Sequence, residues 1–168
     1  MTIPQRLKRA PLRRAASMIA VACALLATPA SAAEDESAAV LAANARFYAA
    51  LNKLFTGDAA AIEAVWSHAG DVTYMGPGGG FERGWSAAFE VWKSQAALKL
   101  GGRVEPVDVH MAIGPEIAVV TNYEEGENTN ANGKAERVKL RATNTYRKEG
   151  GEWKMIGHHT DPLPFLAK

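Results

Sequence analysis

The chain has 168 residues, of which 19 are basic and 18 are acidic. The first 32 residues hold five of the basic side chains and none of the acidic ones, so residues 33–168 carry fourteen basic and eighteen acidic groups, a net charge of −4. This acidic balance argues against nucleic acid or an anionic membrane as a partner. The length of residues 33–168 suits one domain that buries about two thirds of its unfolded surface.

The N-terminal 32 residues have the three parts of a secretory signal peptide. Residues 1–17 are basic, residues 18–27 are apolar, and small residues with an A-x-A pattern end at Ala32. The apolar run is shorter than the roughly 20 residues that span a bilayer. We therefore predict that residues 1–32 are a cleaved signal peptide and that residues 33–168 are a periplasmic or secreted domain with no membrane contact after cleavage. Arg13-Arg14 leaves the choice between the general secretory and twin-arginine routes open.

The single cysteine, Cys23, lies inside the predicted signal peptide. Residues 20–23 resemble a lipoprotein cleavage box, but the apolar run continues through residues 24–27, which favours a cysteine that is removed with the signal. The mature domain then has no cysteine, so it forms no disulfide and has no thiol nucleophile.

A long amphipathic helix is predicted over residues 37–55, because apolar residues recur there every three or four positions. Asn44 falls inside this apolar stripe, so it either finds a hydrogen-bond partner in the core or faces a cavity. Gly57 ends the helix, and Asp58 is the predicted N-cap of a second helix whose buried side includes Ile62.

The rest of the chain predicts a strand, a third helix and a run of further strands. Residues 71–75 are β-prone, and aromatic residues at helical spacing predict a helix over residues 85–98. Helices followed by a meander of strands indicate an α+β domain with an antiparallel sheet. The meander is predicted at residues 103–113, 117–127, 135–148 and 153–160.

The segment 117–121 is apolar at both alternating positions of the predicted strand. One face of the sheet is then able to pack on the helices and the other on a second subunit, which predicts a homodimer. The alternative is a short central strand that carries additional Val and Ala residues without a partner.

The last two segments form a predicted hairpin around Gly150-Gly151, a pair that suits a tight turn with positive φ. Counting back from this turn pairs Asn144 with Gly157 and Ala142 with His159. One face of the hairpin then mixes aromatic groups with an amide and an imidazole, which is typical of a mostly apolar pocket. The members of this face are Ala142, Asn144, Tyr146, Trp153, Met155 and His159.

His159 and Asp161 are the candidate catalytic residues of this hairpin. An imidazole titrates near neutral pH and serves as general base or acid, and Asp161 is placed to hold its far nitrogen. The alternative is a histidine whose nitrogens are satisfied by backbone or by a tyrosine hydroxyl at the rim of the core. His158 is expected on the opposite face of the strand, so the two histidines cannot chelate one metal ion.

Six aromatic or amide side chains are candidates for ligand contact. Core packing is the alternative for most of the aromatic ones. No metal is predicted, because the remaining histidines have no ligand partner at a recognisable spacing. No cofactor is predicted, and nucleotide-binding and hydrolase motifs are absent from the sequence. The six candidates are Tyr48, Tyr74, Trp92, Asn144, Tyr146 and Trp153.

The final hairpin carries Thr143, Tyr146, Gly151, Trp153 and His159, with Asp161 two residues later. This motif and the order of elements resemble the nuclear transport factor 2-like superfamily, in particular its SnoaL-like domains, which usually have a serine where Asp161 stands. The resemblance covers residues 37–165. It implies a cone-shaped, cystatin-like fold in which three helices pack on a curved, mainly antiparallel sheet around a pocket.

The same superfamily includes ketosteroid isomerases, polyketide cyclases and the association domain of calcium/calmodulin-dependent protein kinase II. The isomerase reaction, as the resemblance implies it, needs a carboxylate base and acidic hydrogen-bond donors in an apolar pocket. The positions around Tyr74 and Met75, where the resemblance places the base, hold no acid. This absence disfavours an isomerase.

Three hypotheses follow. The first is an exported SnoaL-like domain that binds a small, partly apolar organic molecule in its cone, with catalysis left open. The second is a cofactor-independent isomerase, cyclase or lyase that uses His159 with Asp161. The third is a non-catalytic homo-oligomerisation module whose sheet surface carries the partner contacts.

Overall fold

The computed structural model describes residues 29–129 and 132–162, which form three helices and six strands. The predicted α+β class is confirmed. Residues 1–28 of the predicted signal peptide lie outside the described residues, and in the described part no helix is both long and apolar enough to cross a membrane. The elements are α1 (Pro29–Leu54), α2 (Ala60–Val65), β1 (Thr73–Met75), β2 (Glu82–Arg83), α3 (Trp85–Leu98), β3 (Arg103–Ile113), β4 (Ile117–Thr129), β5 (Ala135–Glu149) and β6 (Glu152–Pro162).

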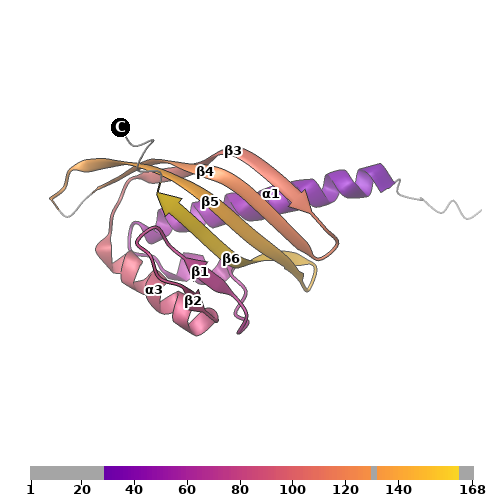
Figure 1. Ribbon diagram of the computed structural model, residues 1–168, viewed down its shortest axis with the longest axis horizontal. Helices are drawn as coiled ribbons and strands as arrows, with labels where there is room; N and C mark the ends of the chain where they lie inside the picture. The colour runs from indigo at the N-terminus through magenta and orange to yellow at the C-terminus, as the bar shows by residue number, and fades with distance from the viewer. Residues whose placement is uncertain (1–28, 130–131, 163–168) are drawn as a thin grey trace, which may run out of the picture.

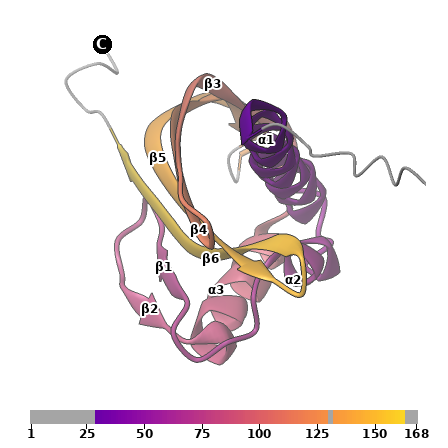
Figure 2. The same ribbon diagram turned by 90° about the vertical axis from the view of Figure 1, so that its right-hand side faces the viewer.

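The strands form one sheet in the order β2-β1-β6-β5-β4-β3. All neighbours are antiparallel except β1 and β6, which run parallel. Figure 1 shows the long strands β3 to β6 side by side with α1 running behind them, and Figure 2 shows the sheet curving with α1 along its inner side. The predicted cone-shaped arrangement of helices on a curved, mainly antiparallel sheet is therefore confirmed.

Helix α1 packs against the sheet with the apolar stripe that the sequence predicts. Val40, Phe47 and Leu54 are fully buried and lie at intervals of seven residues, which is two helical turns. The helix begins at Pro29, earlier than expected, and ends at Leu54. The N-cap position of α2 is Ala59, one residue later than predicted, but the side chain of Asp58 accepts hydrogen bonds from the first N–H groups of α2 at 3.1 and 3.3 Å, as a capping side chain does.

The sheet has an inner face toward α1 and an outer face away from it, and β4 shows both. Val120, Asn122 and Glu124 alternate along the strand and are buried on the inner face, whereas Thr121 between them is exposed on the outer face. Two of these three buried residues are polar. The inner face therefore combines an apolar core with groups that need hydrogen-bond partners.

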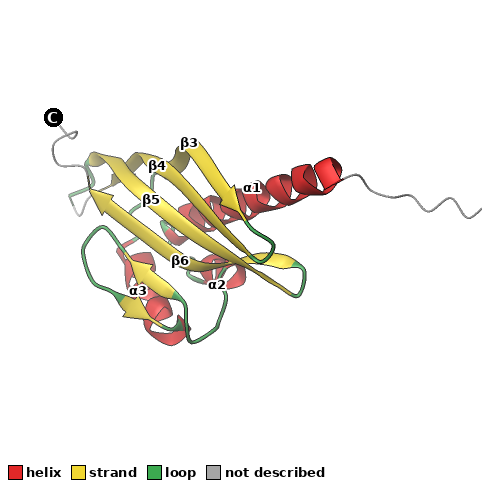
Figure 3. Ribbon diagram, turned by 45° about the vertical axis from the view of Figure 1, so that its right-hand side comes forward, coloured by secondary structure: helices red, strands yellow, loops and turns green. Residues whose placement is uncertain are grey.

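Helix α3 covers the β1 end of the inner face (Figure 3). Its buried residues Ala88, Trp92 and Ala96 recur every four positions. The Trp92 ring lies 4.4 Å from the ring of Tyr74 on β1, centroid to centroid. This contact joins the helix to the short strands, and it brings two predicted ligand-contact residues to the same end of the molecule.

The hairpin of β5 and β6 turns at Gly150-Gly151 as predicted, with φ of 58° and 89°. The register then shifts, because β6 contains one more residue than β5 near Gly157. The predicted pairing of Asn144 with Gly157 is wrong: Asn144 lies opposite His158, and Ala142 lies opposite Thr160. Since side chains alternate along a strand, this extra residue reverses which histidine faces inward.

Candidate functional site

A cavity of about 260 Å³, here called the cone cavity, lies between α1, α3 and the inner face of the sheet. Its wall is apolar where Leu51 of α1, Trp92 of α3 and Leu140 of β5 face it. Glu124 of β4 and His158 of β6 add a carboxyl group and an imidazole to this wall, and Arg137 of β5 also lines it. A mostly apolar cavity with a few polar groups is the usual form of a site for a small organic ligand.

Glu124 is 3% exposed and has one close hydrogen bond, from the Tyr48 hydroxyl to its Oε1 at 3.0 Å. Burial disfavours the charged carboxylate and raises the pKa of Glu124 to about 7, although the bond from Tyr48 opposes this rise. A carboxyl group with this pKa is present in both protonation states near neutral pH. Glu124 is therefore able to accept or to donate a proton in the cone cavity.

His158 is 4% exposed, and its Nδ1 lies 2.6 Å from the Asn144 side-chain oxygen. An amide oxygen only accepts, so Nδ1 of His158 carries the proton and Nε2 keeps a free lone pair. Burial, helped by the charge on His159, lowers the pKa of His158 to about 3. The imidazole is neutral at physiological pH, and its Nε2 lies 3.8 Å from Oε1 of Glu124.

A network of amides and tyrosine hydroxyls supports these two groups from α1 and the sheet. The Asn44 side-chain oxygen accepts hydrogen bonds from Asn144 and from the Tyr146 hydroxyl, each at 2.9 Å. Asn44 thus has partners in the core, which decides between the two alternatives that the sequence left open. On the other side, Asn122 donates to the Tyr48 hydroxyl at 2.8 Å. This network fixes the hydroxyl that binds Glu124 and the amide that binds His158.

The structure separates the six predicted ligand-contact residues into three groups. Tyr74 and Trp92 line the cone cavity. Tyr48, Asn144 and Tyr146 belong to the supporting network described above. The sixth residue, Trp153, lies outside both groups.

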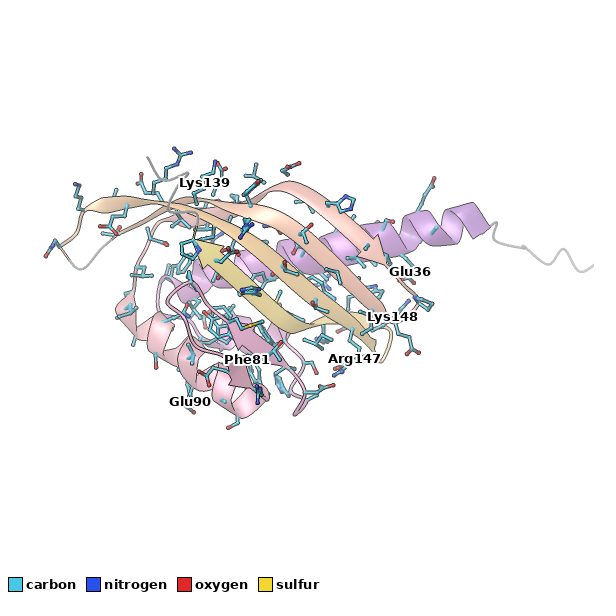
Figure 4. The ribbon with its side chains drawn as sticks, viewed as in Figure 1. Glu36, Phe81, Glu90, Lys139, Arg147 and Lys148 are labelled. Atoms are coloured by element: carbon cyan, nitrogen blue, oxygen red, sulfur yellow. The ribbon has the colours of Figure 1, made fainter. Side chains whose placement is uncertain are left out.

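Trp153 is buried beside α1, where its indole N–H donates to the Glu36 carboxylate at 3.1 Å. Lys148 is hydrogen-bonded to the same carboxylate, and Figure 4 shows Glu36 and Lys148 near each other beside α1. Trp153 does not line the cone cavity among the residues described. Trp153 lines a different cavity, beside Ala43 and Arg46 of α1, and its ligand-contact role stays a prediction.

The predicted placement of His159 on the pocket face is also wrong. His159 is exposed on the outer face, because the extra residue in β6 reverses the alternation. Asp161 is hydrogen-bonded to Arg141 instead of His159. His159 and Asp161 line a separate hollow of about 580 Å³ on the outer face. Their catalytic role stays a prediction.

Sequence reasoning missed Glu124 and His158. Glu124 follows Val120 and Asn122 at alternating positions of β4, so the sequence places its carboxylate on the same face as these two residues. A carboxylate on the face that packs against the helices could have been recognised as a candidate site residue. The sequence does not indicate that His158 faces inward, because the extra residue in β6 that turns it inward does not alter the pattern of apolar residues. Within residues 29–129 and 132–162, no three His, Cys, Asp or Glu side chains are arranged to hold a metal ion, and the predicted absence of metal stays a prediction.

Solved structures share this architecture. A proposed dehydratase of the nuclear transport factor 2-like family from Streptomyces avermitilis has a TM-score of 0.70 and 22% identity, covering 78% of this chain and 98% of its own. A proposed calcium/calmodulin-dependent protein kinase type II association domain from Thiobacillus denitrificans has a TM-score of 0.61 and 27% identity, with 73% and 93% covered. A cystatin-like protein from Caulobacter vibrioides has a TM-score of 0.63 and 17% identity, with 79% and 94% covered.

No curated protein matches the sequence. The model of the SnoaL-like domain family matches residues 40–162, which span α1 from Val40 to the end of β6 and include the cone cavity with Glu124 and His158. The chain belongs to the SnoaL-like domain family, on the nuclear transport factor 2-like fold.

Proposed function

We propose that this domain binds a small, partly apolar organic molecule in the cone cavity. The observation that carries the proposal is the cavity itself, with apolar walls and with Glu124 and His158 set into them. A dry cavity of about 150 Å³ holds benzene. The cone cavity, at about 260 Å³, therefore suits a molecule of one or two rings. A module that serves only for homo-oligomerisation has no need of an internal cavity, so the cone cavity favours ligand binding over that hypothesis.

A thermal-shift screen of residues 33–168 tests this proposal. The panel contains one- and two-ring alcohols, ketones and acids, with steroids as ligands expected to be too large. A ligand that binds the folded state raises the melting temperature in a saturable way. If no one- or two-ring compound shifts the melting temperature, the proposal fails.

Two neighbouring substitutions locate the binding. Val138 lines the cone cavity, whereas the ammonium of Lys139 lies 5.7 Å from the ring centroid of Tyr123 and Figure 4 shows Lys139 away from the helices. Val138→Phe adds a ring inside the cavity and should abolish the shift. Lys139→Phe adds the same ring outside and should leave the shift unchanged. Equal effects of the two substitutions would place the ligand elsewhere.

Proton-transfer catalysis is the second candidate function, and the pKa of Glu124 favours it. The sequence argument against an isomerase relied on the lack of an acid near Tyr74. Glu124 comes from β4 and lines the same cavity as Tyr74, so it supplies a carboxylate that the local sequence does not show. We assign the proposed acid–base chemistry to Glu124 and His158 in place of His159 and Asp161, because Glu124 is a buried carboxyl group with a raised pKa in the wall of the cone cavity.

Hydrogen exchange at carbon tests this chemistry without a known substrate. Glu124 as carboxylate would remove a proton next to the carbonyl of 4-hydroxy-1-tetralone, and a deuteron from D₂O would return to the same carbon. We expect the protein to speed this exchange and Glu124→Gln to remove most of the acceleration. Exchange at the buffer rate with the unaltered protein, at concentrations where the compound binds, would argue for binding alone.

A homodimer through the outer face of the sheet is also proposed. Val107 and Ile117 are each 43% exposed there, which is unusual for apolar strand residues without a partner. Sedimentation should show a dimer that Ile117→Asp weakens.

The proposed export is tested by the N-terminus of the mature protein, which should be Ala33.

A further inference from the structure

The His158 side chain is buried, and its Nε2 atom accepts no hydrogen bond from the described residues. Oε1 of Glu124 lies 3.8 Å from Nε2, which is longer than a hydrogen bond, and it already accepts from Tyr48. A buried acceptor that lacks a donor is unfavourable. His158 lines the cone cavity, so a molecule in the cavity is in reach to supply that donor.

We propose that the cone cavity selects neutral one- or two-ring compounds that carry a hydroxyl group, and that this hydroxyl donates a hydrogen bond to Nε2 of His158. This inference rests on the proposed ligand-binding function and adds the chemical class of the ligand. Ethers and ketones of the same size have acceptors only, so they leave Nε2 of His158 without a partner.

The acceptor role of Nε2 follows from the amides behind the histidine. Asn144 donates through its amide nitrogen to the Asn44 oxygen, so its own oxygen faces Nδ1 of His158. With Asn44 oriented so that its oxygen accepts from Tyr146, turning the Asn144 amide over would bring two amide oxygens against each other. The proton of His158 is therefore held on Nδ1, and Nε2 is left to accept.

Glu124 strengthens the same selection. Above its pKa of about 7 it is a carboxylate, which accepts hydrogen bonds and does not donate them. A ligand hydroxyl then meets acceptors on β4 and on β6. A ligand carboxylate beside Glu124 would meet its negative charge, which disfavours an acidic ligand at this position. The Arg137 guanidinium also lines the cavity, but its side chain is 74% exposed, so solvent weakens its attraction for an anion.

Three matched probes test the inference by titration calorimetry at pH 8: 1-naphthol, 1-methoxynaphthalene and naphthalene. We expect 1-naphthol to bind about tenfold more tightly than 1-methoxynaphthalene, the difference that one good hydrogen bond produces. Equal affinity of the three probes would overturn the hydroxyl selection while ligand binding stands. Failure of all three to bind would overturn the hydroxyl selection together with the proposed cavity for two-ring molecules.

A substitution inside the cavity separates His158 from Thr160, another candidate for binding the ligand hydroxyl. Thr160 also lines the cavity, and its hydroxyl has no partner among the described residues. Thr160→Val keeps the shape and removes that hydroxyl. The preference for 1-naphthol should persist in Thr160→Val and disappear in His158→Phe. A preference that disappears in Thr160→Val would assign the selection to Thr160 and overturn the role of His158.

Nitrogen-15 NMR of the unaltered protein gives a test that does not depend on the folding of a His158 variant. We expect a proton on Nδ1 of His158 and an unprotonated Nε2, whose signal moves when 1-naphthol is added. The same signal should move little with 1-methoxynaphthalene. A proton found on Nε2 of free His158, or equal responses to the two probes, would overturn the proposal.

Discussion

His158 and His159 are neighbours in the chain, yet they lie in two different environments. His158 is buried on the inner face, bound to Asn144 and close to Glu124. His159 is exposed on the outer face. The difference shows that a titratable residue acquires its chemistry from the face of the sheet it occupies. One extra residue in β6 decides that face.

The two faces also hold different kinds of polar contact. On the inner face the groups are neutral or near their pKa, and they are joined by hydrogen bonds inside the core. On the outer face Arg141 and Asp161 form an ion pair in which the Arg141 side chain is 59% exposed. Buried polar groups depend strongly on their partners, whereas solvent-exposed pairs contribute little to stability.

Replacing each histidine by alanine should give the largest contrast. His158→Ala removes a buried ring and leaves the Asn144 oxygen without its donor, so we expect a loss of about 2–4 kcal/mol in the free energy of unfolding. His159→Ala should change it by less than about 0.5 kcal/mol, since the side chain is exposed. Urea unfolding of both variants measures the difference. Similar losses would show that His159 has a structural role that its exposure does not indicate.

The pH dependence of stability should separate the two inner titratable groups. Burial raises the pKa of Glu124 from 4.5 to about 7, so the stability it contributes is complete below pH 4.5 and is lost as pH rises through 7. The pKa of His158 is lowered from 6.5 to about 3, so its contribution is complete above pH 6.5 and is lost as pH falls toward 3. Between pH 4.5 and 6.5 the two slopes oppose each other.

Glu124→Gln removes one of these slopes. Its free energy of unfolding should fall by about 1.4 kcal/mol for each pH unit between 6.5 and 4.5, relative to the unaltered protein. The tyrosines that face the pair, Tyr48, Tyr74 and Tyr146, stay neutral in this range because burial raises their pKa values above 10. Urea unfolding across this pH range measures the slope, and parallel curves for the two proteins would contradict the raised pKa of Glu124.

The smallest effect is expected on the outer face. The Arg141 guanidinium holds the pKa of Asp161 below its usual value, but both groups are in contact with solvent, which weakens their attraction. Asp161→Asn should therefore move the urea midpoint at pH 7 much less than His158→Ala does. The change should shrink further at high salt. A loss as large as that of His158→Ala would mean that the outer face is covered in solution.

Local patterns in the sequence were sufficient for the elements. The stripe through Val40, Phe47 and Leu54 predicted α1, and Gly150-Gly151 predicted the final turn. The candidate site was predicted only in part: Tyr74 and Trp92 line the cavity, but the proposed catalytic pair does not. Counting residues back from a turn gives the correct face only while the residues of the two strands pair one to one, and the extra residue in β6 between Met155 and Gly157 breaks that pairing.

The amino-acid sequence by itself determined the α+β class and the order of helices and strands, because these depend on periodicity and turn residues that are read locally. The superfamily followed from the resemblance of the final hairpin and of the element order to known SnoaL-like domains. Only the tertiary structure decided the chemistry of the cavity. Three elements bring its polar groups together: β4 carries Glu124, β6 carries His158 and α1 carries Tyr48. These groups meet because the sheet curves around the helix. Their pKa values follow from that burial, which no local pattern specifies.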